Sequence, residues 1–163
     1  MIDADEFDMQ IDKYISLIDV FISSKQYFVS LYPNEHYERG LKEICSRGPR
    51  VAITTLGKKG CAGFDGNEYF TLPVIDLPVI DSTGAGDVFH GAYIHGMLKG
   101  WKAKQCARFA TAVASAKCTA IGGRAGIPNF KTAIRLMETG MLDNTEIKKR
   151  VDYYRKGLTS LLL

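Results

Sequence analysis

Apolar positions in the first third of the chain follow helical and strand spacings in turn. A helical stripe over residues 7–18 precedes a short apolar run of strand length at 19–23, and a second stripe over 37–45 precedes the β-branched run at 50–55. Ser24 is expected to cap a short helix that ends before the proline at position 33. The pattern therefore predicts alternating helices and strands.

The pattern changes after residue 60. Two strand-like runs flank Asp65-Gly66-Asn67, which is a strong hairpin signal. Apolar helical stretches then follow one another, separated by turn-forming residues. We expect these helices from about residue 85 to 98, from about 103 to 120 with a stop at Gly122-Gly123, from Pro128-Asn129 onward, and from 144 to the end, where Asn144 or Thr145 would cap the last one.

Alternating helices and buried strands are typical of an α/β fold, in which helices cover both faces of a doubly wound, mainly parallel sheet. The hairpin adds one antiparallel element to it. The segment Met1-Ile2-Asp3 resembles the end of a further buried strand. A sheet of so few strands is small for a doubly wound fold. We therefore expect residues 1–163 to form a single partial domain of a larger architecture.

Composition narrows the function classes. The chain has 163 residues, 46% of them hydrophobic, and a formal net charge of +3, and no Lys/Arg block is interleaved with aromatic residues, so we expect no nucleic-acid partner. No apolar run approaches the ~20 residues that span a bilayer, and Met1 leads directly into an acidic stretch, so we expect a cytoplasmic protein without a membrane segment. The four cysteines show no CxxC spacing and are expected to be free thiols.

The stretch "DSTGAGD", residues 81–87, carries the candidate chemistry. Gly84 and Gly86 lack a Cβ, so the backbone can turn sharply and a ligand can approach closely. From Ala85 onward the first amides of a helix have no intrahelical partner and form an anion site. Asp87 at this position either compensates the helix dipole or acts as a general base for a hydroxyl that attacks a phosphate. The stretch matches neither the Walker A pattern nor GxGxxG.

The longer string "DSTGAGDVFHGAYIHG" resembles the C-terminal signature of the ribokinase/PfkB family of carbohydrate kinases. Two more stretches support this: "VAITTLGKKGC" resembles the strand and loop that meet the nucleotide, and "ARFATAVASAKCTAIGGRAGIP" resembles the helix and loop that border the adenine and a monovalent-cation site. The resemblance covers residues 3–137. It implies a ribokinase-like fold and transfer of a phosphoryl group from ATP, with Mg²⁺, to a sugar hydroxyl.

The resemblance also implies roles for individual residues. Asp87 would take the proton from the sugar hydroxyl, and the backbone amides of Gly84, Ala85 and Gly86 would form the anion hole for the transferred phosphoryl group. The implied nucleotide-binding residues are Thr55, Gly57, Thr111, Ala112 and Ser115. The implied ligands of a monovalent cation such as K⁺ are Asp81, Thr83, Ala120 and Gly122.

The chain departs from the family pattern at several positions. Many members carry a serine near the cation, where this chain has Gly126, and an Asn-x-x-Glu motif, where this chain has "SSKQYF". Ser24-Lys25 and Lys117-Cys118 resemble ketohexokinase-like members instead. The N-terminal half of the family, with its sugar-binding carboxylate, Gly-Gly element and β lid, has no counterpart in these 163 residues.

We therefore expect the C-terminal, ATP-binding half of a PfkB-type sugar kinase, inactive toward sugars on its own. Two alternatives stay open: a nucleotide-binding module or subunit without catalysis of its own, and a vitamin or nucleoside kinase of the same fold. An incomplete parallel sheet exposes an apolar edge, which predicts self-association into a homo-oligomer.

Overall fold

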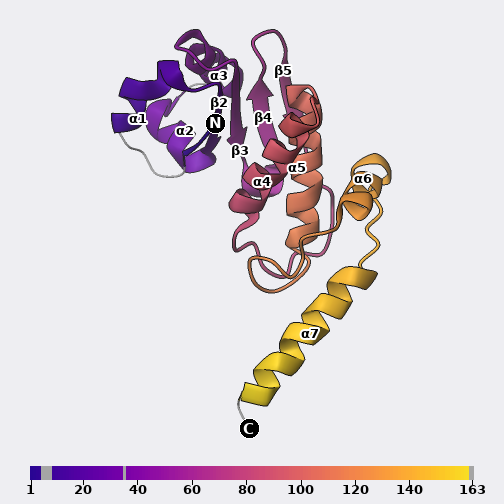
Figure 1. Ribbon diagram of the computed structural model, residues 1–163. Helices are drawn as coiled ribbons and strands as arrows, with labels where there is room; N and C mark the ends of the chain where they lie inside the picture. Colours follow the sequence, from indigo (N-terminus) through magenta and orange to yellow (C-terminus); the bar gives the residue numbers. More distant parts are fainter. Residues whose placement is uncertain (5–8, 35, 162–163) are drawn as a thin grey trace.

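The computed structural model describes residues 1–4, 9–34 and 36–161, and Figure 1 shows their arrangement around one sheet. The sheet has five strands in the order β1-β2-β3-β4-β5; β1 pairs with β2 and β2 with β3 in parallel, whereas β4 and β5 continue the sheet as an antiparallel hairpin. The strands are β1 (Ile2–Ala4), β2 (Val20–Ser24), β3 (Val51–Thr55), β4 (Cys61–Phe64) and β5 (Tyr69–Leu72). The predicted α/β class and the hairpin are thus confirmed, and residues 2–4 do form a strand.

Helices cover both faces of the sheet, as predicted (Figure 1). The helices are α1 (Met9–Tyr14), α2 (Lys25–Leu31), α3 (Tyr37–Ser46), α4 (Ala85–Leu98), α5 (Ala103–Lys117), α6 (Phe130–Thr139) and α7 (Thr145–Leu161), with short 3-10 turns η1 (Ile15–Leu17) and η2 (Gly57–Lys59). Among the described residues no helix has the length and apolar character needed to cross a membrane.

Alternation along the strands creates two cores. Ile22 and Ile53 point to the face covered by α4 and α5, where they join a cluster with Tyr93. Their neighbours Phe21 and Ala52 point to the other face and pack with residues of α2 and α3. The centres of β2 and β3 are therefore buried on both sides, which explains why each of these strands begins with three consecutive apolar residues.

Local signals fix several boundaries. Ser24 caps α2 as predicted, since its hydroxyl accepts the Tyr27 N–H at 3.0 Å. Asn129 caps α6 through the Thr132 N–H at 2.9 Å. In the hairpin, Asp65 Oδ1 accepts the N–H groups of Asn67 and Glu68 at 3.0 and 2.8 Å.

Three helices differ from the prediction in where they begin or end or in how they are capped. Helix α5 stops at Lys117 rather than at Ala120, because the Thr119 hydroxyl donates to the Ala116 carbonyl at 2.7 Å and the next amides form tighter turn-type bonds. At the start of α7, Asn144 directly precedes the helix as expected, but the side chain that binds the Thr145 amide is Asp143, at 3.1 Å. The first helix was expected over residues 7–18; its residues 7 and 8 lie outside the described part, and the helix gives way to 3-10 geometry at Ile15.

Helix α7 extends away from the sheet and its covering helices (Figure 1). Its attachment lies in its first turns, where Ile147 is buried with Ala120 and Ala125. Arg150 adds a hydrogen bond from Nη1 to the Ile127 carbonyl at 2.7 Å. Tyr153, further along the helix, is 74% exposed, so the C-terminal part of α7 makes little contact with the body.

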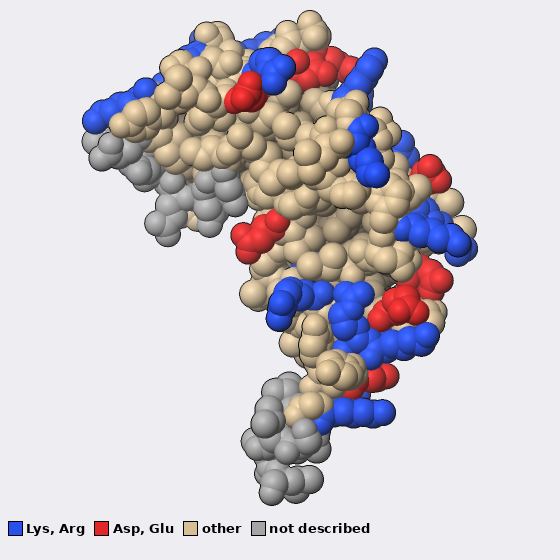
Figure 2. All heavy atoms as spheres, in the orientation of Figure 1, with Lys and Arg blue, Asp and Glu red and all other residues tan. Residues whose placement is uncertain are grey.

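The remaining compositional predictions agree with the structure where it can test them. All four cysteines are free. Figure 2 shows acidic and basic side chains interspersed on the face in view, as the modest net charge suggested.

Candidate functional site

The start of α4 is shaped by Gly84. This residue adopts a left-handed backbone, with φ of 71°, and a Cβ placed on it would lie 3.5 Å from the Gly123 Cα. Glycine therefore suits both the turn and the close approach of the second loop. The Ala85 N–H donates to the Ser82 carbonyl at 3.0 Å, so of the three amides predicted to hold an anion, this one already has a partner. Gly86 follows in the first helical turn, where amides have no preceding helical carbonyl to bind.

Asp81 fixes the turn that leads into α4. Its Oδ1 accepts the Thr83 N–H at 2.8 Å, and its Oδ2 accepts the Gly122 N–H at 2.7 Å from the loop after α5. These amides, that of Thr83 first and that of Gly122 second, lower the pKa of the Asp81 carboxyl to about 2. The amides of Ile80 and Asp81 also donate to the Cys118 carbonyl. The predicted cation ligands Asp81, Thr83 and Gly122 thus lie in one contiguous network, with Ala120 buried in the same loop.

The low pKa of Asp81 predicts an acid-dependent loss of stability. The hydrogen-bonded carboxylate stabilises the fold fully above its ordinary pKa of 3.8, and this contribution is lost as the pH falls toward 2. The melting temperature of the wild type should therefore fall more steeply below pH 4 than that of Asp81→Asn, which has no carboxylate to protonate. Thermal melts from pH 6 to pH 2 test this, and equal slopes for both proteins would contradict it.

A cavity of about 640 Å³ lies on one side of the α4 start. Its walls come from the end of β3, the extended segment before α4, the first turn of α4 and the middle of α5. The lining residues are Thr55, Gly57, Lys58, Gly60, Val74, Ile75, Asp76, Leu77, Val79, Ser82, Ala85, Gly86, Phe89, Thr111, Ala114, Ser115 and Cys118. Residues far apart in the sequence, from position 55 to 118, meet at this cavity.

Four of the five predicted nucleotide-binding residues line this cavity: Thr55, Gly57, Thr111 and Ser115. The Ser115 hydroxyl also accepts the Ile75 N–H at 3.2 Å and so holds the extended segment against α5. Ala112 does not line the cavity. It is completely buried and packs with Ala116 and Leu136 on another face of α5.

The sequence prediction missed part of the cavity wall. Lys58 adds a positive charge beside Gly57, and Phe89 adds an aromatic wall from α4. The extended segment from Val74 to Val79 also lines the cavity, and its apolar residues before the glycine-rich turn were a signal that it packs against a helix.

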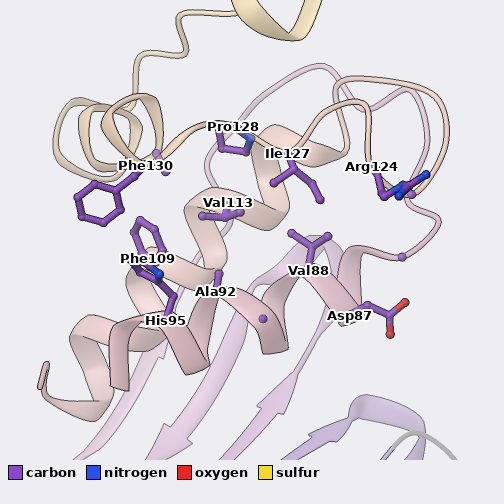
Figure 3. A pocket seen from close by; sticks show the side chains of 14 residues that line it. Asp87, Val88, Ala92, His95, Phe109, Val113, Arg124, Ile127, Pro128 and Phe130 are labelled. Atoms are coloured by element: carbon purple, nitrogen blue, oxygen red, sulfur yellow. The ribbon is translucent and has the colours of Figure 1, made fainter. Parts of the chain in front are cut away.

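A second cavity of about 530 Å³ lies on the other side of the same helix start, between α4, α5 and α6. Asp87, which is exposed, lies at one end of it together with Arg124 (Figure 3). Apolar and aromatic side chains fill the other end, among them His95, Phe109 and Phe130 (Figure 3). The first turn of α4 therefore separates two cavities, and its carboxylate belongs to the second one.

Comparison with known proteins identifies the family of the chain. The family model described as pfkB family carbohydrate kinase matches residues 3–129. The ribokinase of Lactococcus lactis is 30% identical over 116 residues, which are 71% of this chain and 37% of that protein.

Solved structures agree in fold. The ribokinase of Arabidopsis thaliana, determined with ribose and ATP, superposes with a TM-score of 0.71 at 26% identity and covers 83% of this chain and 47% of its own. The ribokinase of Thermotoga maritima superposes with a TM-score of 0.74 at 22% identity over 85% of this chain and 49% of its own. The chain thus spans less than half the length of these relatives.

Proposed function

Because the chain belongs to the pfkB family of carbohydrate kinases, we propose that it provides the ATP site and the catalytic base of a sugar kinase. The observation that carries the proposal is the α4 start, where Ala85 and Gly86 line one cavity and the Asp87 carboxylate lines the other. Direct phosphoryl transfer needs donor and acceptor in contact at a site that stabilises negative charge, and both cavities reach the exposed residues Gly86 and Asp87 at this helix start.

The nucleotide would occupy the cavity lined by Thr55, Gly57, Thr111 and Ser115. Its walls are largely apolar, with Phe89 and Leu77 available to a base, and polar groups are few, as in typical small-molecule sites. Lys58 at the same cavity attracts phosphates. The γ-phosphoryl group would then lie at the first turn of α4, near Ala85 and Gly86.

Asp87 would accept the proton of the attacking hydroxyl at the exposed end of this turn, where the acceptor can contact the phosphoryl group. A carboxylate is an acceptor of hydrogen bonds, so it can orient a hydroxyl oxygen toward the phosphorus and take its proton as the new bond forms. The amides at the start of α4 and the positive end of the helix dipole would stabilise the charge on the transferred group. Arg124 at the same end of the second cavity adds positive charge near the reacting groups.

Mg²⁺ would enter with ATP. The ion takes most of its oxygen ligands from phosphates and water and needs only one or two carboxylates from the protein. Asp76, an exposed residue on the wall of the nucleotide cavity, is placed to contribute one. When bound, the ion neutralises charge on the phosphates.

The sugar itself would be selected by residues outside this chain, since the second cavity is open beside Asp87 and the chain spans 37–49% of its relatives. A sugar-binding half, covalently joined or a separate subunit, is therefore the proposed partner. A nucleotide-binding subunit without catalysis is the second candidate, favoured by "SSKQYF" in place of the family's Asn-x-x-Glu motif. Nucleotide binding is common to both, whereas only the first requires Asp87 for turnover.

Filling the nucleotide cavity is expected to weaken ATP binding. Ala114 contributes a small side chain to its wall, so Ala114→Phe places an aromatic ring in the space proposed for the base. Calorimetric titration with MgATP should show at least a tenfold weaker affinity, equivalent to about 1.4 kcal/mol. Gly91→Ala, which adds a methyl group toward the second cavity with nothing within 4 Å of it, is the control and should bind like the wild type. Equal affinity for all three proteins would contradict the proposed location of the nucleotide.

A further inference from the structure

Lys117, the last residue of α5, has a side chain with no solvent exposure (0%). Its Nζ donates a hydrogen bond to the backbone carbonyl of Asp81 at 2.8 Å. Lysine is almost never fully buried, because an ammonium group loses its hydration unless polar atoms replace the water. The burial of this ammonium group against the turn that leads into α4 therefore suggests a role in addition to packing.

The turn reached by Lys117 is rich in oriented oxygen atoms. The Asp81 carbonyl points to the ammonium group, while the Asp81 carboxylate is held by the amides of Thr83 and Gly122. The positive charge of Lys117 also contributes to the low pKa of the Asp81 carboxyl, after the hydrogen bonds. A small cation would be bound by the same kind of atoms, namely carbonyl and carboxylate oxygens.

Gly126 shows how the second loop accommodates this arrangement. A Cβ placed on Gly126 would lie 2.2 Å from the Lys117 carbonyl oxygen and 2.8 Å from its Cα. These atoms belong to the backbone and cannot swing aside, so a side chain at position 126 would force the loop away from the end of α5. The serine that many family members carry near their cation therefore cannot be placed here while α5 and the loop keep this packing.

One oxygen of the residues expected to hold a monovalent cation, the Asp81 carbonyl, thus already accepts a hydrogen bond from an ammonium group of the chain, which would repel a second cation at this position. We propose that Lys117 replaces the monovalent cation in this protein. Its tethered charge holds the turn of residues 81–84 and, through it, the first turn of α4, so Lys117 is a positioning residue that makes the site independent of K⁺. The effect on stability follows from the contacts alone, whereas the effect on nucleotide binding rests on the proposed function.

The first test uses the wild-type chain. Its melting temperature and its affinity for MgATP should be the same in KCl, NaCl and tetramethylammonium chloride at equal ionic strength. The last cation is too large for a site among carbonyl oxygens and serves as the reference. A melting temperature that rises specifically in KCl would overturn the proposal, because it would reveal a cation site that Lys117 does not occupy.

The second test removes the ammonium group in two ways. Lys117→Ala leaves room for a small cation, and its melting temperature should fall by about 5 °C or more in tetramethylammonium chloride. Addition of KCl or NH₄Cl should restore most of this loss, with a saturable dependence on concentration. Lys117→Met fills the space with an uncharged chain, so it should be destabilised and should not respond to either salt. Lys131→Ala, at an exposed lysine of α6, is the matched control and should melt like the wild type.

These outcomes separate the inference from the proposed function. Wild-type stability for Lys117→Met, or a Lys117→Ala protein that folds and ignores K⁺ and NH₄⁺, would overturn the role of Lys117. If Lys117→Ala fails to fold in every salt, the comparison of Lys117→Met with the wild type decides the question. Absence of MgATP binding by the wild type in all salts would contradict the proposed function, while the melting temperatures would still test Lys117.

Discussion

Asp87→Asn is expected to lower phosphoryl transfer to a sugar by about 10²–10⁴-fold, the range typical of a lost general base. The amide has nearly the shape of the carboxylate but cannot take a proton from the attacking hydroxyl. Because Asp87 faces the second cavity rather than the nucleotide cavity, the affinity for MgATP should be unchanged, or slightly tighter once a negative charge near the phosphates is gone.

The assay follows sugar-dependent ADP formation by the chain combined with the sugar-binding half of a ribokinase, fused in front of it or added as a separate protein. The chain alone should form little ADP with any sugar. Asp152→Asn, at an exposed carboxylate of α7, is the control for a lost negative charge and should keep wild-type turnover. Undiminished turnover by Asp87→Asn would exclude the base, and robust sugar-dependent turnover by the chain alone would contradict the need for a second half.

Tyr93→Ala is expected to destabilise the protein by about 3–5 kcal/mol, the usual cost of removing a large aromatic side chain from a core. Tyr93 is 1% exposed and lies on the face of α4 that packs against the sheet and α5, and burial also raises the pKa of its hydroxyl. Its loss would leave a cavity beneath the helix whose first turn carries the site.

Urea denaturation gives the change in unfolding free energy directly. The matched control is Ile94→Ala, on the next residue of the same helix, where the side chain is 42% exposed and less apolar contact is lost. Its destabilisation should be well below that of Tyr93→Ala. Similar values for the two variants would mean that α4 is held to the body by contacts other than those of its buried face.

Local rules were sufficient for much of the fold. Ser24 before a helical stripe, and Asp65-Gly66-Asn67 between two strand-like runs, each have a side chain that satisfies the backbone amides of the turn it was expected to form. The α4 boundaries were predictable for the same reason, because Gly84 is needed for a left-handed turn and an acidic residue follows in the first helical turn. Such signals depend on neighbours in the sequence.

The rest depends on contacts between distant segments. Ala112 and Ser115 lie on one helix, yet only Ser115 faces the nucleotide cavity, and the sequence does not show how α5 is rotated. The burial of Lys117 depends on the Asp81 carbonyl, 36 residues earlier in the chain. A lysine in the last turn of a helix ordinarily lies at the surface and compensates the helix dipole, so its position in the sequence alone favours an exposed side chain.

The position of the α4 start at both cavities has a consequence for how substrate preference can change. Gly86 lines one cavity and Asp87 the other, and both residues are exposed, so donor and acceptor would meet at this open end of the helix. The cavity proposed for the donor is lined by residues of this chain, from Thr55 to Cys118, whereas the residues proposed to select the sugar lie outside it. If the proposed function holds, changes on the acceptor side would alter which alcohol is recognised without disturbing the donor site.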